Sequence, residues 1–142
     1  MVERTTIEQF IHSVGEFGRF QDRVPLRLSQ GEPFVLNYLY NQRSAQPSQI
    51  SVAMQVSTAR ITTILNGLEK RGLVARQADE ADHRRVNVCL TEQGRAYVVQ
   101  SREEMMEVLS EMLTRLGPED TAELLRILDR LTGICDQLLP KK

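Results

Sequence analysis

The chain is poor in the residues on which most metal and disulfide chemistry depends. Its 142 residues include two cysteines, Cys89 and Cys135, and two histidines, His12 and His83. The cysteines form no Cys-x-x-Cys motif, and neither histidine stands at ligand spacing from a cysteine or from the other histidine. We therefore predict no metal site and no cofactor. Two reduced thiols in apolar settings are the simplest interpretation of the cysteines, with a redox-sensing role as the alternative.

Long apolar runs are missing as well. No segment approaches the roughly 20 apolar residues of a membrane span. The N-terminus carries Glu3, Arg4 and Glu8 in place of the basic-then-apolar layout of a signal peptide. These observations predict a cytoplasmic protein that has no membrane partner.

The groupings that most enzymes need are also absent from the sequence. There is no Gly-rich phosphate loop, no histidine close to a nucleophile and no pair of carboxylates in a cleft-like context. We therefore expect a binding protein and predict that the chain is not an enzyme.

Length and composition describe an ordinary globular domain. The chain is long enough to bury one real core, and its 41% hydrophobic and 26% charged residues are close to average. The net charge is −1, distributed as 0 over residues 1–56, +2 over residues 57–85 and −3 over residues 86–142. A modestly basic centre is a weak footprint for a polyanion, and it gains weight only together with a motif.

Apolar residues at three- and four-residue steps predict six helices. The first covers residues 5–20, and the second follows a capping box of Ser29 and Glu32 and ends near residue 41. A short third helix covers residues 48–54, with Pro47 at its first position and Ile50 and Ala53 facing inward. Ser57 caps the fourth helix, Thr91 the fifth, and the last begins near residue 118. The list of expected buried residues in the fourth helix is Ile61, Ile64, Leu65 and Leu68.

Two extended segments, residues 73–77 and 86–90, separate the fourth and fifth helices and enclose a charged loop. The fold class that follows is mainly α with a small β-hairpin (α+β). We predict a single domain over residues 1–142, with a winged helix-turn-helix lobe at residues 29–90. Residues 1–28 and 91–142 would then form N- and C-terminal helical dimerisation regions.

The fourth helix carries the polar face expected of a helix that enters the major groove of DNA. Short polar groups dominate this face, whereas an ordinary solvated helix face is usually rich in Glu and Lys. Its N-terminal amides favour an approaching phosphate. The candidate DNA-binding residues on this helix are Ser57, Thr58, Arg60, Thr62, Thr63, Asn66 and Lys70. A solvated face remains the alternative, and Lys70 in the last turn also suits the helix dipole.

These residues resemble the MarR (multiple antibiotic resistance regulator) family over residues 28–97. The resemblance rests on three runs: Leu-Glu-Lys-Arg-Gly-Leu-Val at residues 68–74, Asp-His-Arg-Arg at residues 82–85, and Leu-Thr-Glu-Gln-Gly at residues 90–94. The family's wing pattern, Asp-x-Arg followed shortly by Leu-Thr-x-x-Gly, is present in register. The family's thiol-based and zinc-based sensing modes are disfavoured, because the cysteines and histidines that they need are missing.

The resemblance implies roles for three wing residues. Arg84 is expected to enter the minor groove, where a narrow and negative channel attracts a guanidinium. Asp82 is expected to hold that arginine in place, and Arg85 to add a phosphate contact. The alternative is a solvated charged turn.

The resemblance also implies a homodimer of intertwined terminal helices that binds a pseudo-palindromic operator on double-stranded DNA. The apolar residues that one small core would not obviously need are Val108, Leu109, Leu113, Leu125, Leu128 and Leu138. Such relatives are often repressors released by a small aromatic or anionic effector. The candidate effector-binding residues are His12, Phe17, Tyr38 and Tyr40. The alternatives are a winged-helix module that binds protein without specific DNA binding, and a cysteine-based redox-sensing regulator.

Overall fold

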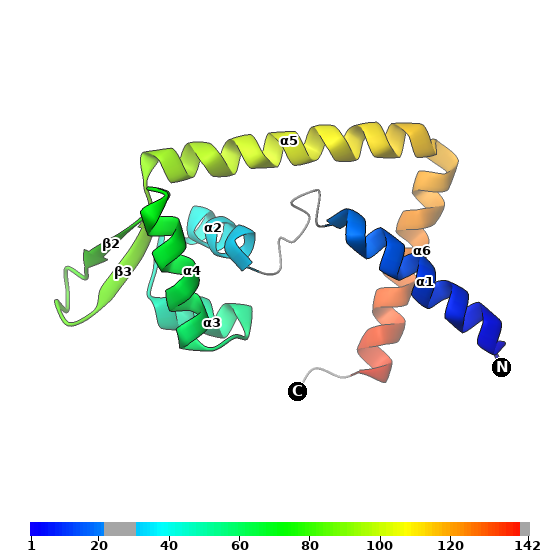
Figure 1. The fold of residues 1–142 in the computed structure, drawn as a ribbon, viewed down its shortest axis with the longest axis horizontal. Helices are drawn as coiled ribbons and strands as arrows, with labels where there is room; N and C mark the ends of the chain where they lie inside the picture. Colours follow the sequence, from blue (N-terminus) through cyan, green and yellow to red (C-terminus); the bar gives the residue numbers. More distant parts are fainter. Residues whose placement is uncertain (22–30, 140–142) are drawn as a thin grey trace. The chain divides into compact units, whose positions relative to one another are not determined.

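The computed structural model describes the backbone of residues 1–21 and 31–139. The chain divides into two compact units, Met1–Met105 and Met106–Lys142, and each is considered by itself. Figure 1 follows the elements along the chain. Their order is α1 (Arg4–Gln21), α2 (Gly31–Gln42), β1 (Ser44–Ala45), α3 (Pro47–Met54), α4 (Thr58–Lys70), β2 (Val74–Ala78), β3 (Val86–Leu90), α5 (Glu92–Leu116) and α6 (Pro118–Leu138).

The strands form one small antiparallel sheet in the order β1-β3-β2. In the β2–β3 hairpin, Val74 pairs with Leu90 and Ala78 pairs with Val86. The edge strand β1 adds two more pairs to β3, the first joining Ser44 to Cys89. The sequence predicts the hairpin, but it predicts a loop where β1 lies. A two-residue strand is too short to show the alternation by which strands are recognised.

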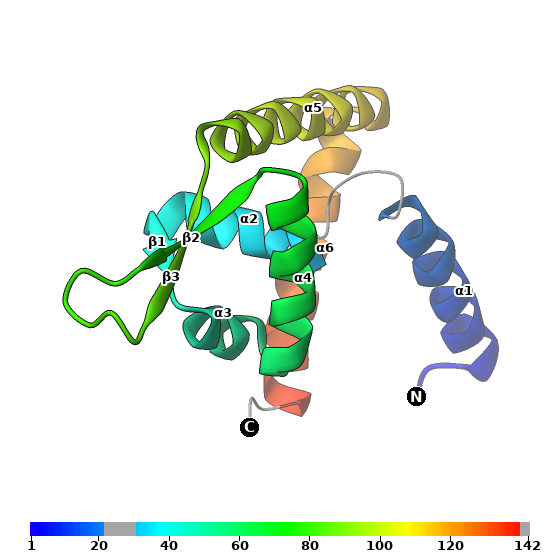
Figure 2. The same ribbon diagram turned by 60° about the vertical axis from the view of Figure 1, so that its left-hand side comes forward.

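One apolar core joins the sheet to the helices around it. Figure 2 shows α2, α3 and α4 grouped about the strands. The buried residues of this cluster are Val35, Leu36 and Leu39 of α2, Ile50 and Met54 of α3, Ile61, Leu65 and Leu68 of α4, Ala45, Leu73, Val74, Val88 and Leu90 in or beside the strands, and Val98 of α5. The contribution from α5 means that the core extends beyond the predicted lobe at residues 29–90.

The helices expected from periodicity are confirmed within one to a few residues at each end. The buried stripe of α4 is also confirmed, with Ile64 partly buried beside three fully buried neighbours. The prediction for Ala53 is wrong: it is exposed, whereas Ser51 is buried and its Oγ donates to the carbonyl of Ser48 at 3.1 Å. Ser29, half of the expected capping box, lies outside the described residues.

Tight left-handed residues close the ends of α3 and α4. Gln55 adopts φ 57° at the end of α3, and its backbone N–H bonds the carbonyls of Ser51 and Val52. Gly72 adopts φ 70° just after α4, as its position predicts. The turn between α3 and α4 is therefore only three residues long, and it holds the two helices close together.

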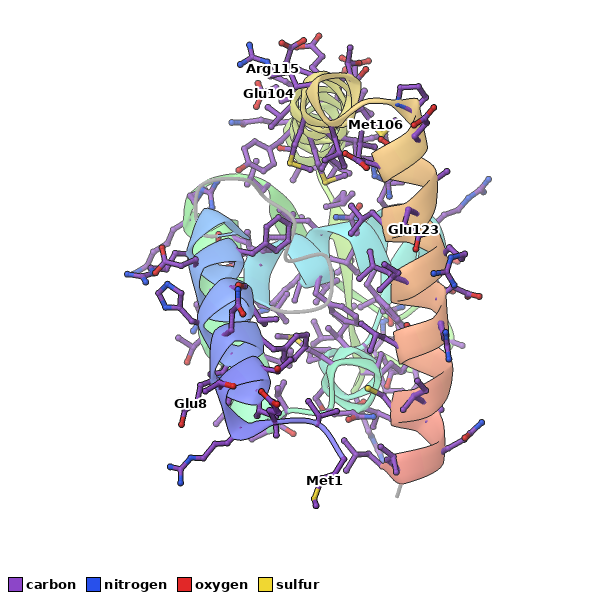
Figure 3. All side chains as sticks on the ribbon, turned by 90° about the vertical axis from the view of Figure 1, so that its right-hand side faces the viewer. Met1, Glu8, Glu104, Met106, Arg115 and Glu123 are labelled. Atoms are coloured by element: carbon purple, nitrogen blue, oxygen red, sulfur yellow. The ribbon has the colours of Figure 1, made fainter. Side chains whose placement is uncertain are left out.

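The terminal helices α1 and α6 expose apolar side chains; Figure 3 draws these side chains as sticks. The exposed apolar residues of α1 are Ile7, Phe10, Ile11, Val14 and Phe17, and those of α6 include Leu124, Leu125, Leu128 and Leu138. No residue of α6 is buried. None of the helices in the described ranges is long and apolar enough to cross a membrane.

Candidate nucleic-acid interface

The N-terminus of α4 is built as the sequence predicts. Ser57 precedes the helix in an extended conformation, and its Oγ accepts a hydrogen bond from the backbone N–H of Arg60 at 3.3 Å. This bond satisfies one of the amides that a helix start leaves unpaired. The neighbouring amides remain at the exposed end of the helix, where they and the helix dipole favour an anion.

The exposed face of α4 carries Thr58, Thr62, Thr63 and Asn66. The Oγ1 of Thr62 donates to the carbonyl of Thr58 at 3.0 Å, and the Oγ1 of Thr63 donates to the carbonyl of Ala59 at 3.1 Å. Each hydroxyl has one proton, so these two threonines have spent their donors inside the helix. They present methyl groups and acceptor lone pairs instead. The sequence alone predicts that these hydroxyls can both donate and accept hydrogen bonds, whereas in the structure they can only accept further ones.

Asn66 is hydrogen-bonded to a residue of β2, Arg76, to which the sequence analysis assigned no role. Arg76 of β2 donates from Nη2 to Oδ1 of Asn66 at 2.9 Å. Its Nε lies 3.6 Å from Oε2 of Glu69, one helical turn beyond Asn66. The sequence does show a basic residue in the strand that follows this polar helix. It does not show that the two residues are in contact, because the contact depends on how β2 and α4 pack on their shared core.

Three cations stand at the interface without a side-chain partner among the described residues. Arg60 and Lys70 lie at the two ends of α4, and Arg84 lies in the wing loop; all three are exposed. Arg71 differs from them, because it bonds Glu32 at 2.7 Å and lies over the Tyr97 ring at 5.3 Å. Contact with Tyr97, then with Glu32, holds the pKa of Arg71 above its ordinary value. Arg71 therefore anchors the end of α4 to α2 and α5.

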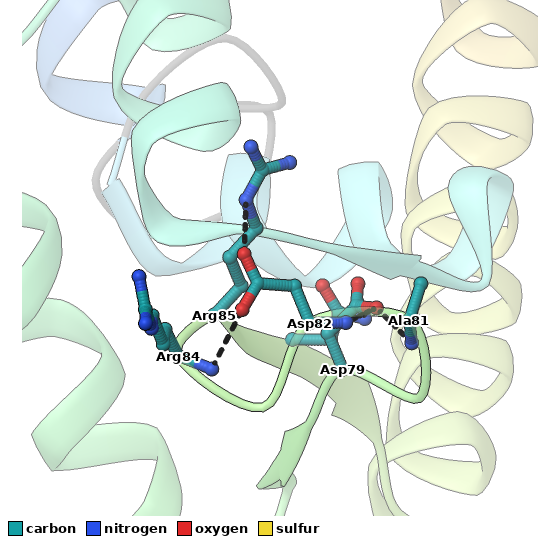
Figure 4. Close-up of polar contacts among 6 residues, drawn as sticks. Asp79, Ala81, Asp82, Arg84 and Arg85 are labelled. Atoms are coloured by element: carbon teal, nitrogen blue, oxygen red, sulfur yellow. Dashed lines mark hydrogen bonds and ion pairs between the residues drawn. The ribbon is translucent and has the colours of Figure 1, made fainter.

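The wing loop between β2 and β3 is organised by two aspartates (Figure 4). Asp79 Oδ1 accepts from the backbone N–H of Ala81 at 2.8 Å and of Asp82 at 3.2 Å, and its Oδ2 accepts from Asn87 Nδ2 at 3.0 Å. These bonds lower the pKa of Asp79, the Ala81 amide most and the Asn87 side chain next. Sequence reasoning did not assign Asp79 a role.

Asp82 contacts both wing arginines, but in different ways. Its Oδ1 accepts from the backbone N–H of Arg84 at 3.1 Å, and its Oδ2 lies 3.6 Å from the Nε of Arg85. The resemblance implies that Asp82 holds Arg84 in place. The structure shows that Asp82 bonds the backbone of Arg84 and pairs its charge with Arg85, and the Arg84 side chain has no partner among the described residues.

The run at residues 90–94 joins the wing to α5. Thr91 Oγ1 donates to the carbonyl of Gly72 at 2.5 Å and accepts from the backbone N–H of Gly94 at 2.9 Å. A Cβ on Gly94 would lie 1.9 Å from the carbonyl oxygen of Leu73, so only glycine fits at this crossing. The Leu-Thr-x-x-Gly pattern is therefore a structural clamp between the end of α4 and the start of α5.

The candidate effector residues lie on α1 and α2. His12 and Phe17 lie on the exposed surface of α1. Tyr38 stacks on Phe34 with ring centroids 6.0 Å apart, and Arg102 covers the ring of Tyr40 at 4.3 Å. A cavity of about 70 Å³ lies between α2 and α5, and none of the four residues lines it. Its lining is Glu32, Pro33, Leu36, Asn37, Tyr97, Val98, Ser101, Arg102 and Met105.

The two cysteines lie in different settings. Cys89 is partly buried in β3, and its Sγ donates to the carbonyl of Ala75 at 3.7 Å, while Cys135 is exposed on α6. Both are free thiols. In the part of the chain that the structure describes, no three His, Cys, Asp or Glu side chains gather into a group suited to a metal ion.

Two helices joined by a three-residue turn and followed at once by an antiparallel hairpin define a winged helix-turn-helix protein. The model of the MarR family matches residues 28–86. The Bacillus subtilis (strain 168) HTH-type transcriptional regulator YwhA is 30% identical over 108 residues, which are 76% of this chain and 78% of YwhA. The chain belongs to the MarR family.

Further comparisons agree with this assignment. The B. subtilis (strain 168) HTH-type transcriptional regulator YdgJ is 30% identical over 104 residues, which are 73% of this chain and 63% of YdgJ. The crystal structure of Streptococcus pneumoniae FabT in complex with DNA superposes with a TM-score of 0.71 at 22% identity, over 96% of this chain and 99% of FabT. The FabT comparison shows the same fold.

Proposed function

We propose that this chain is a transcriptional repressor that binds a pseudo-palindromic operator on duplex DNA as a homodimer. The observation that carries the proposal is the set of exposed cations, Arg60, Lys70 and Arg84, which have no side-chain partner among the described residues. None of these side chains forms an ion pair among the described residues, whereas a phosphate backbone or a groove would pair with them.

The two reading elements suit different grooves of DNA. The face of α4 offers threonine methyl groups, hydroxyl lone pairs and one amide, which are short groups suited to base edges in the major groove. The wing offers Arg84 at the end of a short hairpin, and a single guanidinium suits the narrow minor groove. FabT, which has the same fold, was crystallised in complex with DNA, and this supports the proposed use of the fold here.

A homodimer is supported by the apolar surface of the terminal helices. In α1, Phe10 is 57% exposed and Ile11 63%, while in α6 Leu125 is 58% exposed and Leu128 50%. Contiguous apolar stripes of this kind normally mark a protein interface. A twofold dimer presents two copies of α4, so the half-sites should be one helical turn apart, ~34–36 Å.

Release by a small aromatic or anionic effector is the finer part of the proposal. Its candidate residues remain His12 and Phe17 on α1 and Tyr38 and Tyr40 on α2. Benzoate is a suitable probe, with cyclohexanecarboxylate as a control of equal charge that lacks the aromatic ring. We expect benzoate to weaken operator binding more than the control does. Equal effects of the two anions would contradict an aromatic effector.

The salt dependence of binding tests the proposal directly. Duplexes enriched from a random pool by the full chain would be titrated by fluorescence anisotropy at several salt concentrations. With two to four phosphate contacts in each of two subunits, the logarithm of affinity should fall against the logarithm of salt concentration with a slope of about −4 to −7. Failure to enrich any duplex, or a slope near zero, would contradict DNA binding and favour the protein-interaction alternative.

A further inference from the structure

Arg76 occupies an unusual place beside the polar face of α4. Its guanidinium lies between two side chains one helical turn apart, bonded to Asn66 Oδ1 at 2.9 Å and paired with Glu69 Oε2 at 3.6 Å. The Arg76 side chain is 33% exposed, which is less than the 45% of Glu69. Arg76 is thus held against the helix face, with part of its guanidinium open to solvent.

This contact fixes the orientation of the Asn66 amide. A guanidinium has N–H donors and no acceptor, so only the oxygen of an amide can face it. The Asn66 oxygen is therefore committed to Arg76, and the Asn66 Nδ2 group points elsewhere on an exposed side chain. An asparagine without such a neighbour can turn its amide over and offer either atom first.

The neighbouring side chains make this orientation matter. Asn66 follows Thr62 and Thr63 by four and three residues, so the three share one face of α4. The hydroxyl protons of both threonines are bonded to backbone carbonyls of α4. Beside these two threonines, the Nδ2 group of Asn66 and the open side of the Arg76 guanidinium still offer donors.

Each base pair presents a different pattern to such a surface. Adenine offers N7 as an acceptor next to an N6 amino donor, and asparagine reads it by turning one donor and one acceptor toward the base. Guanine offers two acceptors, N7 and O6. With Arg76 at the oxygen end of the Asn66 amide, adenine would meet a donor where it needs an acceptor, whereas guanine would meet donors at both atoms.

We propose that Arg76 positions Asn66 as a hydrogen-bond donor, adds its own open N–H groups beside it, and thereby makes α4 select guanine over adenine at one position of each half-site. The inference depends on the proposed DNA-binding function. Glu69 supports it by holding the Nε side of Arg76, so that the guanidinium stays beside Asn66 and is not drawn to a phosphate.

The test compares the base preferences of four proteins selected on the same pool of random duplexes. The variant Asn66→Ala identifies the position that Asn66 reads, because the preference there should flatten. Wild type should enrich guanine at this position. Arg76→Ala should lower the ratio of guanine to adenine there by about tenfold, within the range of one base contact, and should leave the other positions unchanged. Arg76→Lys keeps a charged donor beside Asn66 and should retain most of the guanine preference.

The outcomes separate this inference from the proposed function. If wild type enriches no duplex, the chain does not bind specific DNA, and both proposals fail. If the ratio of guanine to adenine at this position is the same in Arg76→Ala as in wild type, or if wild type selects adenine there, only the proposed role of Arg76 fails. Loss of all enrichment by Arg76→Ala at unchanged helical content by circular dichroism would show that Arg76 is needed for DNA binding as a whole, which overturns a role confined to one base position.

Discussion

At the scale of single residues, Arg84 combines a fixed backbone with an exposed guanidinium. Its backbone is bonded to Asp82, whereas its side chain is exposed and has no partner among the described residues. Arg85, the next residue, is paired with Asp82 at 3.6 Å. Of the two neighbouring arginines, Arg84 is therefore the one whose charge is available to a ligand.

We expect Arg84→Ala to weaken operator binding by about tenfold or more, because a guanidinium in a groove contributes on the order of 1–3 kcal/mol. The measurement is fluorescence anisotropy with the selected duplex. The matched control is Arg115→Ala, which removes an exposed arginine that pairs with Glu111 on α5. Unchanged affinity of the Arg84→Ala protein at unchanged helical content would refute the role of Arg84 in the minor groove.

Gly94 is constrained by a backbone contact, so its replacement tests the clamp between α4 and α5. Gly94→Ala should lower the free energy of unfolding by about 2–4 kcal/mol, because the Cβ would lie 1.9 Å from the carbonyl oxygen of Leu73. Gly67→Ala is the matched control, since its Cβ would meet only Glu32 Oε1 at 3.6 Å. That variant should gain about 0.5–1 kcal/mol from reduced chain entropy.

Urea unfolding followed by circular dichroism, with all proteins at the same concentration, measures both effects. A Gly94→Ala protein as stable as wild type would show that Leu73 and Gly94 can move apart without loss of stability. The clamp would then not be the reason for the Leu-Thr-x-x-Gly pattern.

At the scale of elements, the wing is a hairpin whose loop depends on an ionised carboxylate. The pKa of Asp79 lies below its ordinary value of 3.8, chiefly because the Ala81 amide donates to it. A group whose pKa is lowered by folding stabilises the folded form above its ordinary pKa. That stabilisation is lost as the pH falls through the lowered value. The wing should therefore loosen in acid while remaining ordered at neutral pH.

Amide resonances of the wing, followed by NMR from about pH 5 to about pH 2, test this expectation. The Ala81 amide should shift with a midpoint below pH 3.8 as the carboxylate is protonated. In Asp79→Asn, which retains an acceptor oxygen but does not titrate, this shift should disappear. A midpoint above pH 3.8 in wild type would contradict the assigned hydrogen bonds.

The helix-turn-helix itself shows which local rules decide an element. Pro47 and Ser57 open α3 and α4 as predicted, because both act through their own backbone or through an amide three residues away. The inward-facing residues of α3 were harder to predict. In eight residues the helical period is sampled only twice, and Ser51 replaces Ala53 in the buried set because its hydroxyl is satisfied within the helix.

At the scale of the whole molecule, the apolar stripes of α1 and α6 should place two subunits together. We expect Ile11→Asp in α1 and Leu128→Asp in α6 to shift the chain from dimer to monomer at micromolar concentration, because each change buries a charge in an apolar interface. Val52→Asp is the matched control, since Val52 of α3 is 77% exposed but lies outside both terminal helices.

Sedimentation velocity over a range of concentrations measures the change in mass. Operator affinity should fall together with dimerisation in both variants, because the two half-sites would no longer be bound as one unit. A wild-type chain that sediments as a monomer at all concentrations would refute the dimer. Dimers in both variants would show that these stripes do not form the interface.

The amino-acid sequence determined the helices, their ends and the hairpin through interactions between residues close together in the chain. Helix periods, the Ser57 cap, Gly72 and the wing motif each act within a few residues, so they specified the winged helix-turn-helix, and the comparisons confirmed the family. The polar face of α4 was also visible in the sequence, since the residues on it recur at helical spacing.

Tertiary structure decided what those groups can offer to a partner. Sequence spacing cannot show that Arg76 commits the Asn66 oxygen, that Asp79 bonds Asn87 across the wing loop, or that Gly94 passes within contact of Leu73. Each of these contacts joins elements, or opposite ends of a loop, that only the shared core and the hairpin register bring together. Donors and acceptors spent in such contacts are no longer free for DNA, so the chemistry of the candidate interface follows from the fold.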